Sequence, residues 1–133
     1  MLLLLHRLEH QIVDGLQPVL TEKKLSYEQW RLLAALSGAP GQTMTQLGHI
    51  TALPSTSVTR HVDKLVERAL VIRRIDPADK RRVVAALSAR GTRMVDEICT
   101  AERALADPLL ERILPSVSPE TFFEALNTLA NPA

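Results

Sequence analysis

Side chains that can bind phosphate oxygens are concentrated in one stretch of this sequence. Residues 59–82 hold eight Lys and Arg against four Asp and Glu, whereas the rest of the chain holds eight against eleven. The net charge of all 133 residues is only +1, so the segregation is not a consequence of overall composition. Because charge distribution reflects what a protein binds more than how it folds, this stretch indicates a polyanionic partner.

A helix is predicted over residues 55–69. Apolar and polar positions fall on opposite sides of it, the first comprising Val58, Val62, Leu65, Val66 and Ala69 and the second Thr56, Ser57, Arg60, Lys64 and Glu67. Alone, this pattern is typical of an amphipathic helix with a solvated charged face. However, residues 42–59 contain no charged side chain, although acids usually favour a helix N-terminus. Acids there would repel phosphates, whereas Ser and Thr hydroxyls bond phosphates or base edges.

A shorter helix is predicted over residues 44–50, with a tight corner at Ala52 and Leu53 before the second helix. Pro54 suits the first turn of that second helix, where its missing N–H is no loss. Two helices joined in this way are typical of a helix-turn-helix, whose second helix enters the DNA major groove with its N-terminus first. Arg60 would then be placed to form two hydrogen bonds with a guanine edge.

A β-hairpin with a charged tip is predicted next. Residues 70–74 and 82–88 are rich in β-branched and apolar side chains, and they flank IDPADK, which has turn chemistry. A surface turn with weak ion pairs is the ordinary alternative. Beside a recognition helix, the basic residues instead predict a contact with the neighbouring minor groove, with Asp79 holding Arg81 in place. The predicted DNA-contacting residues are Thr43, Thr45, Ser55, Thr56, Ser57, Thr59, Arg60, His61, Lys64, Arg73, Arg74, Asp79, Lys80, Arg81 and Arg82.

The elements that position these residues are mainly helical. Ser26, with Gln29 three residues later, is a capping-box signature for a helix that the turn cluster at residues 37–41 ends. An earlier helix is predicted from apolar residues that recur every three or four positions, namely Leu5, Leu8, Ile12, Leu16 and Val19.

Two further helices are predicted after the hairpin. Ser88 is expected to cap a helix over residues 89–106 that breaks near Asp107 and Pro108, because proline disfavours helix at the preceding residue. Ser118 is expected to begin a last helix, which carries Phe122, Leu126 and Leu129 on one face. The predicted fold class is therefore mainly α with a small β-hairpin.

Composition narrows the protein class. Hydrophobic residues make up 46% of the chain and charged residues 23%, which is typical of a globular domain. After MLLLL, Arg7 and Glu9 arrive too soon for a bilayer span, and no secretory cleavage site follows. The single cysteine, Cys99, excludes an internal disulfide and suits a cytoplasmic protein. We find no phosphate-binding glycine loop and no nucleophile motif, so neither an enzyme nor a cofactor is predicted.

Five sequence blocks carry a family resemblance. LSYEQWRLL, TQLG, STSVTRHVDKLVERALVIRR, DPADKRR and LSARG occur in this order between Leu25 and Gly91. They resemble the winged helix-turn-helix regulators of the MarR (multiple antibiotic resistance regulator) family, and the flanking helices fit that family in pattern only. The resemblance implies a homodimeric transcription factor, usually a repressor, on an inverted-repeat operator in double-stranded DNA. It also implies release by a small, often aromatic or anionic, ligand between the dimer region and the DNA-binding lobe.

The resemblance also implies that residues 1–133 form a single MarR-type domain with two regions. Residues 1–24 and 89–133 would form the helical dimerisation region, and residues 25–88 the winged helix-turn-helix lobe. Within one short chain the apolar stripes of the first and last helices have no partner. The predicted dimer contacts are therefore Leu5, Leu8, Ile12, Leu16, Phe122 and Leu126.

The chain departs from the family pattern at three points. Ala69 stands where a helix-ending glycine is usual, and Gly48 stands where alanine is common. The first helix lacks a leader, from which we expect smaller dimer contacts. The main alternative function is a winged helix that binds protein, which should show an apolar or acidic outer face.

Two features leave sensing open. Cys99 is either a redox switch or a packed core residue, and the absence of a second cysteine favours packing. His6 and His10 have a spacing that can hold a metal, but no cluster of further ligands surrounds them, so no metal site is predicted. His49 and His61 are expected to serve the helix-turn-helix as packing residues or phosphate donors.

Overall fold

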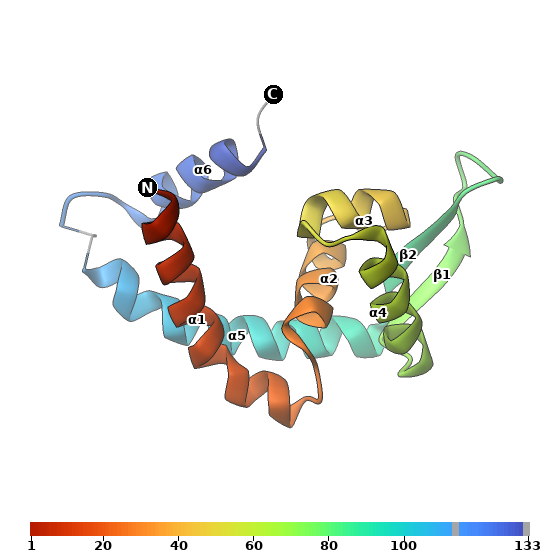
Figure 1. Cartoon of the computed structure of the whole chain (residues 1–133), viewed down its shortest axis with the longest axis horizontal. Helices are drawn as coiled ribbons and strands as arrows, with labels where there is room; N and C mark the ends of the chain where they lie inside the picture. Colours follow the sequence, from red (N-terminus) through yellow and green to blue (C-terminus); the bar gives the residue numbers. More distant parts are fainter. Residues whose placement is uncertain (113–114, 132–133) are drawn as a thin grey trace.

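The computed structural model describes residues 1–112 and 115–131, which form helices and one β-hairpin that projects at one end of the molecule (Figure 1). In chain order the elements are α1 (Leu2–Glu22), α2 (Tyr27–Gly38), α3 (Met44–Thr51), α4 (Ser55–Glu67), β1 (Val71–Ile75), β2 (Val83–Leu87), α5 (Ala89–Glu111) and α6 (Pro119–Ala130). The antiparallel strands pair Val71 with Leu87 and Ile75 with Val83. The predicted fold class, mainly α with a small β-hairpin, is confirmed.

Local hydrogen bonds fix where the helices begin. Ser26 and Gln29 form a reciprocal capping box at the start of α2. Ser88 Oγ accepts a hydrogen bond from the Gly91 N–H at 2.9 Å, and Ser118 Oγ accepts one from the Thr121 N–H at 3.2 Å. Each of these bonds satisfies a backbone donor that the first turn of a helix would otherwise leave free. The three predicted caps are therefore confirmed.

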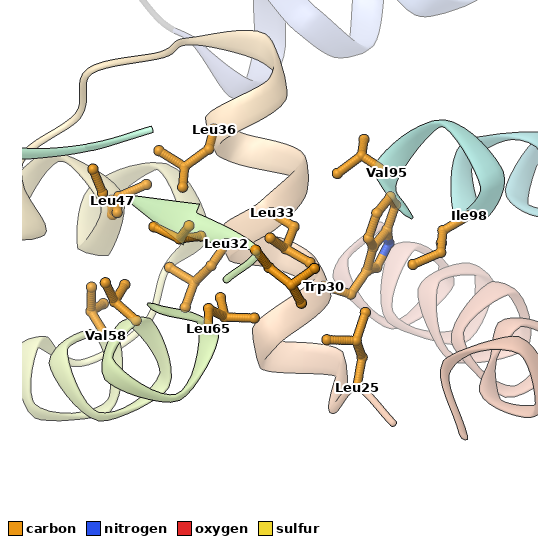
Figure 2. Packing of buried hydrophobic residues seen from close by; sticks show 14 of the residues in the cluster. Leu25, Trp30, Leu32, Leu33, Leu36, Leu47, Val58, Leu65, Val95 and Ile98 are labelled. Carbon is orange, nitrogen blue, oxygen red and sulfur yellow. The ribbon is translucent and has the colours of Figure 1, made fainter. Parts of the chain in front are cut away.

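Helix α2 lies at the centre of the hydrophobic core. Its Trp30 is only 4% exposed and points toward Val95 and Ile98 of α5 (Figure 2). Further along α2, Leu32 and Leu36 belong to the same buried cluster, together with side chains of α3 and α4. Since each large apolar side chain stabilises the fold by about 1.5–3 kcal/mol when buried, α2 joins the helix-turn-helix firmly to α5.

The elements form two arms that α5 connects (Figure 1). One arm contains α2, α3, α4 and the hairpin, and the other contains α1, the C-terminal half of α5 and α6. Helix α1 packs against both α5 and α2. In the part of the chain that the structure describes, no helix is both long and apolar enough to cross a membrane.

The predicted break in the long helix is wrong, because α5 continues through Pro108 to Glu111. Proline's fixed φ of about −65° is compatible with a helix, although the missing N–H costs one backbone hydrogen bond. Packing on both sides of Pro108 favours continuity. Leu105 lies against Gly15 of α1, and Leu109 and Leu110 line an apolar groove beside α6.

Two alanines adopt the left-handed conformation at helix ends. Helix α4 ends at Glu67, two residues earlier than predicted, and Ala69 follows with φ of 56°. Ala52, which closes α3, has φ of 54°. Alanine at such a position costs about 1 kcal/mol relative to glycine, because its Cβ approaches the following carbonyl oxygen. Ala69, which stands where glycine is usual in the family that the sequence resembles, therefore adopts the conformation that glycine adopts at lower cost.

Candidate nucleic-acid interface

The corner between α3 and α4 is fixed by backbone bonds. The N–H of Ala52 bonds to the carbonyl oxygens of Gly48 and His49, and the N–H of Leu53 bonds to that of Gly48 at 3.2 Å. The hydroxyl of Thr51 turns inward and donates to the Leu47 carbonyl oxygen at 2.6 Å. Helix α4 then starts after Pro54, which supplies no side-chain cap.

The two faces of α4 lie as the sequence predicts. Val58, Val62 and Leu65 are fully buried in the core. The outer face carries most of the contact residues predicted on α4, and Ser55, Thr56, Thr59, Arg60 and Lys64 are all exposed there. An open hollow of about 490 Å³ on this face is lined by Ser55, Thr56, Thr59, Arg60 and Asp63. Hydroxyls and one guanidinium therefore project together from the first two turns.

His61 lies on the inner side of α4, unlike the exposed residues of this helix that were also predicted to contact DNA. It is 9% exposed, and among the described residues its Nδ1 has no hydrogen-bond partner. Burial lowers the pKa of this imidazole, and the positive charges of Arg60 and Lys64 lower it further, against a small opposing effect of Glu28. A buried neutral ring favours the packing role over the phosphate-donor role.

Two acids organise the tip of the hairpin. Asp76 Oδ1 accepts from the Ala78 N–H at 2.9 Å, and its Oδ2 lies 3.9 Å from Arg82 Nε. Asp79 Oδ1 accepts from the backbone N–H of Arg81 at 3.0 Å. Asp79 thus holds the backbone of Arg81, whereas no ion pair to its guanidinium occurs in the described residues. Lys80 and Arg81 are both exposed at the tip.

The remaining basic residues of the hairpin differ in their contacts. Arg73 forms an ion pair with Asp63 and so links the hairpin to α4. This pair offsets the charge of the acid that lines the same hollow as Arg60. Within the described residues, Arg74 has no ion-pair partner and lies near Gly41. At the start of α3, the Thr43 hydroxyl is occupied in a capping box with Gln46, whereas Thr45 is exposed.

A cavity of about 550 Å³ lies between the two arms. Its walls come from α1, α2, the end of α3 and α5, including Leu8, Ile12, Trp30, Thr51 and Ala52. The end of α3 is therefore both a cavity wall and the first half of the helix-turn-helix corner.

The polar groups of this cavity surround Tyr27. Its hydroxyl donates to Glu9 Oε1 at 3.0 Å, and the Arg31 guanidinium lies 5.5 Å from its ring centre. Burial first, and then Glu9, raise the pKa of Tyr27 to about 12, so the phenol stays protonated. Glu102 of α5 is half-buried, and burial raises the pKa of its carboxyl group.

Comparison with known proteins agrees with this geometry. The profile of the MarR family matches residues 23–82. The HTH-type transcriptional regulator MhqR of Bacillus subtilis (strain 168) is 27% identical over 108 residues, which are 81% of this chain and 74% of MhqR. The crystal structure of a MarR-family transcriptional regulator from Silicibacter pomeroyi superposes with a TM-score of 0.77 at 26% identity, covering 95% of this chain and 82% of that one.

This chain matches the MarR family of winged helix-turn-helix transcriptional regulators in sequence over residues 23–82 and in fold over nearly its whole length. Another similar structure is that of NadR in complex with 4-hydroxyphenylacetate, with a TM-score of 0.83 at 22% identity, covering 97% of this chain and 91% of NadR. The likeness to NadR shows the fold. In the winged helix-turn-helix, α3 and α4 are the paired helices, α4 is the recognition helix and the hairpin is the wing.

The predicted dimer contacts divide into two groups. Leu5 is 51% exposed, Leu8 and Leu126 are each 37% exposed, and Ile12 and Phe122 are partly covered. Leu16 is only 2% exposed and belongs to the core of this chain. The prediction for Leu16 is wrong, because α1 packs against α5 and α2 at that level and leaves no surface for a second molecule.

The structure gives the candidate sensing residues, Cys99, His6 and His10, no arrangement suited to redox or metal chemistry among the described residues. Cys99 is partly covered against the core, and burial raises the pKa of its thiol, with Glu102 and Asp96 adding to the effect. A raised thiol pKa lowers the fraction of reactive thiolate. The rings of His6 and His10 stack 6.3 Å apart, and the described residues contain no cluster of three metal-binding groups.

The cavity residues are the ones that sequence reasoning missed. Tyr27 and Arg31 are four apart on a predicted helix, which could have signalled that their side chains meet. Glu102 lies on a predicted helix, and the apolar face of that helix could have indicated that it packs against other helices. The meeting of Glu9, Tyr27 and Glu102 has no local signature, because they come from three different helices.

Proposed function

We propose that this MarR-family protein acts in the cytoplasm as a repressor and binds an inverted-repeat operator in double-stranded DNA as a homodimer. The observation that carries the proposal is the outer face of α4, where hydroxyls and Arg60 project beside a wing tip that presents Lys80 and Arg81. Apart from Asp63, which pairs with Arg73, the lining of the hollow on that face is free of acids. This face is neither apolar nor acidic, which argues against a protein-binding winged helix.

The division of labour follows from groove chemistry. An α-helix fits the major groove, where Arg60 could bond the O6 and N7 acceptors of a guanine. The wing tip would lie along the flanking minor groove, whose negative potential attracts arginine. Ser55, Thr56 and Thr59 would bond phosphates or base edges and fix the register. Residues 25–88 would form this DNA-binding lobe.

Dimerisation would come from residues 1–24 and 89–133. The N-terminal turns of α1 and one face of α6 expose leucines, including Leu5, Leu126 and Leu129. A groove of about 520 Å³ between α1, α5 and α6 is lined mainly by apolar side chains such as Leu109, Phe122 and Leu126. A second copy that covers these surfaces would bury them and place two recognition helices on one side of the duplex.

The cavity gives a route for regulation. A small molecule between α1, α2, α5 and the end of α3 would contact both arms, and α3 is joined to the recognition helix by a single tight corner. NadR is a MarR-fold protein whose crystal structure contains 4-hydroxyphenylacetate. We propose that an aromatic small molecule in this cavity shifts α3 and α4 and so weakens operator binding.

The test is to incubate the purified protein with fragmented genomic DNA and to sequence what it retains at about 150 mM salt. We expect a small set of fragments that share an inverted repeat with half-sites about one helical turn apart, near 10 bp. Inserting five base pairs between the half-sites should abolish tight binding, because one half-site rotates to the far side of the duplex. Retention without sequence enrichment contradicts an operator-specific repressor, and no retention favours the protein-binding alternative.

A further inference from the structure

The cavity of about 550 Å³ is lined by more acidic than basic side chains. Glu9 and Glu102 contribute two carboxylates, and Arg31 contributes the single guanidinium. The Arg31 group lies over the ring of Tyr27, and Glu9 accepts the hydroxyl hydrogen bond of the same tyrosine. Arg31 therefore contacts the ring face of Tyr27, and Glu9 contacts its hydroxyl group.

Glu102 differs from both. It is half-buried, it lines this cavity and also the groove beside α6, and no hydrogen bond or ion pair to it is present among residues 1–112 and 115–131. Burial alone accounts for the raised pKa of its carboxyl group. A carboxylate partly removed from water without a compensating partner destabilises a fold. Its presence on the wall of a cavity is explained if a ligand supplies the missing partner.

The other walls suit a flat apolar molecule. Tyr27 supplies an aromatic surface, to which the 4%-exposed Trp30 adds only an edge, and Leu5, Leu8, Ile12 and Ile50 supply aliphatic surfaces. Aromatic rings attract cations through their negatively charged faces, and the attraction increases when water is excluded. A carboxylate ligand would bring a third negative charge to the cavity, with only the guanidinium that already lies over Tyr27 to offset it.

We propose that the effector of this cavity is an aromatic molecule with a protonated amine, which pairs with Glu102 while its ring packs between the aromatic and aliphatic walls. The proposal narrows the aromatic or anionic class that the family resemblance implies to an aromatic cation. It rests on the proposed function, in which this cavity holds the effector. Glu9 adds negative potential near the amine, and Arg31 remains over Tyr27.

The test uses three probes with the same indole ring: tryptamine, indole-3-acetate and 3-(2-hydroxyethyl)indole. They carry a cation, an anion and a neutral hydroxyl, respectively, at neutral pH. Titration calorimetry with the full chain should show tryptamine binding about tenfold more tightly than the neutral alcohol, a ratio typical of one charge-assisted hydrogen bond, and indole-3-acetate should bind most weakly. Tighter binding of indole-3-acetate, or no measurable binding of tryptamine, overturns the proposal.

Two variants test whether Glu102 causes the preference for tryptamine over the alcohol. Glu102→Gln keeps the size of the side chain but removes its charge, and it should reduce tryptamine binding to the level of the alcohol. Asp96→Asn is the matched control, because Asp96 is exposed on the same helix and does not line the cavity. At about 150 mM salt its charge is largely screened, so the preference should persist. An unchanged preference in Glu102→Gln overturns the assignment.

Operator binding, measured separately, distinguishes the two proposals. A protein that retains specific DNA but prefers indole-3-acetate remains a regulator whose effector is not a cation. If the protein prefers tryptamine but retains no specific DNA, the assignment of a cationic ligand to the cavity stands and the proposed repressor function is contradicted.

Discussion

Arg68 joins the end of the recognition helix to the turn between α1 and α2 through the carbonyl oxygen of Lys24. Its Nη1 donates to that oxygen at 2.6 Å, and its Nη2 donates to the carbonyl oxygen of Lys23 at 2.8 Å. Lys24 is left-handed, with φ of 54°, and the Lys23 side chain forms an ion pair with Glu97 of α5. One guanidinium thus ties α4 to the helices proposed to form the dimer scaffold.

Arg68→Met should lower the free energy of unfolding by about 1–3 kcal/mol, because two charge-assisted hydrogen bonds are lost and the turn carbonyls lose their donor. The substitution preserves much of the aliphatic stem, so the loss measures the guanidinium. Urea denaturation gives the value. Arg90→Met serves as the control, since Arg90 is exposed and has no side-chain hydrogen bond or ion pair in the described part of the chain. Equal losses in the two variants would contradict the clamp.

Gly91 permits α5 to begin directly against the backbone of Leu70, which precedes β1. A Cβ at this position would lie 2.0 Å from the Leu70 carbonyl oxygen, a clash that backbone movement alone could relieve. Gly91→Ala should therefore destabilise the protein by about 3 kcal/mol or more. Gly38→Ala, at the end of α2, meets nothing within 4 Å and should be neutral or stabilising by up to about 1 kcal/mol. Thermal unfolding of both variants tests the contrast, and a stable Gly91→Ala protein would contradict the close contact.

The exposed leucines predict that the protein is a dimer at micromolar concentration, which light scattering measures as twice the mass of the chain. Leu126→Lys places a charge in the apolar groove beside α6, and we expect it to weaken association at least tenfold, equivalent to about 1.4 kcal/mol. Thr128→Lys adds the same charge on an exposed position of α6 and should leave the mass unchanged. A well-behaved wild-type monomer would remove the basis for paired recognition helices.

His61 predicts a loss of stability on acidification. Its folded pKa is lowered from the ordinary value of 6.5, so below that pH the unfolded chain takes up a proton that the folded chain resists. The contribution is fully present above about pH 6.5 and is lost as the pH falls through the folded pKa. His61→Leu should flatten this part of the stability curve, measured by urea denaturation from pH 7.5 to 5. The exposed His49→Leu should not. An identical slope in all three proteins would contradict the buried neutral ring.

Local signals predicted most of the fold. Ser26, Ser88 and Ser118 mark helix starts through bonds to residues only three positions away, and such bonds depend little on the rest of the molecule. Pro108 shows where that logic fails. The local preference against helix was outweighed by packing of α5 against α1 and beside α6, which no short sequence window contains.

The same distinction applies to the candidate site. The outer face of α4 follows from helical periodicity, so the exposed positions of Arg60 and Lys64 could be predicted. The burial of Leu16 could not, because stripe residues of α1 look alike in sequence until α5 is placed. The family resemblance implied a ligand site between the two regions, but its polar residues could not be predicted, because Glu9, Tyr27 and Glu102 are brought together by helix packing alone.

The two surfaces proposed to contact DNA should differ in what they recognise. Arg60 projects from the helix proposed to enter the major groove, where losing a bidentate contact with guanine costs about 1–3 kcal/mol and removes sequence information. We expect Arg60→Ala to weaken operator binding and to flatten the preference at one base position in each half-site. In a dimer both half-sites lose the contact, so the effect occurs twice.

Arg81 projects from the wing tip, where Asp79 holds its backbone N–H and leaves its guanidinium in solvent. The minor groove offers a degenerate pattern of acceptors together with strong negative potential. Arg81→Ala should therefore weaken operator and random DNA alike, and it should make the dependence of log K on log salt shallower by up to about 0.9 per lost phosphate contact. Binding of both variants to operator and random duplexes at several salt concentrations separates the two roles. If Arg81→Ala alters base preference and Arg60→Ala does not, the wing reads the sequence and the helix only anchors it.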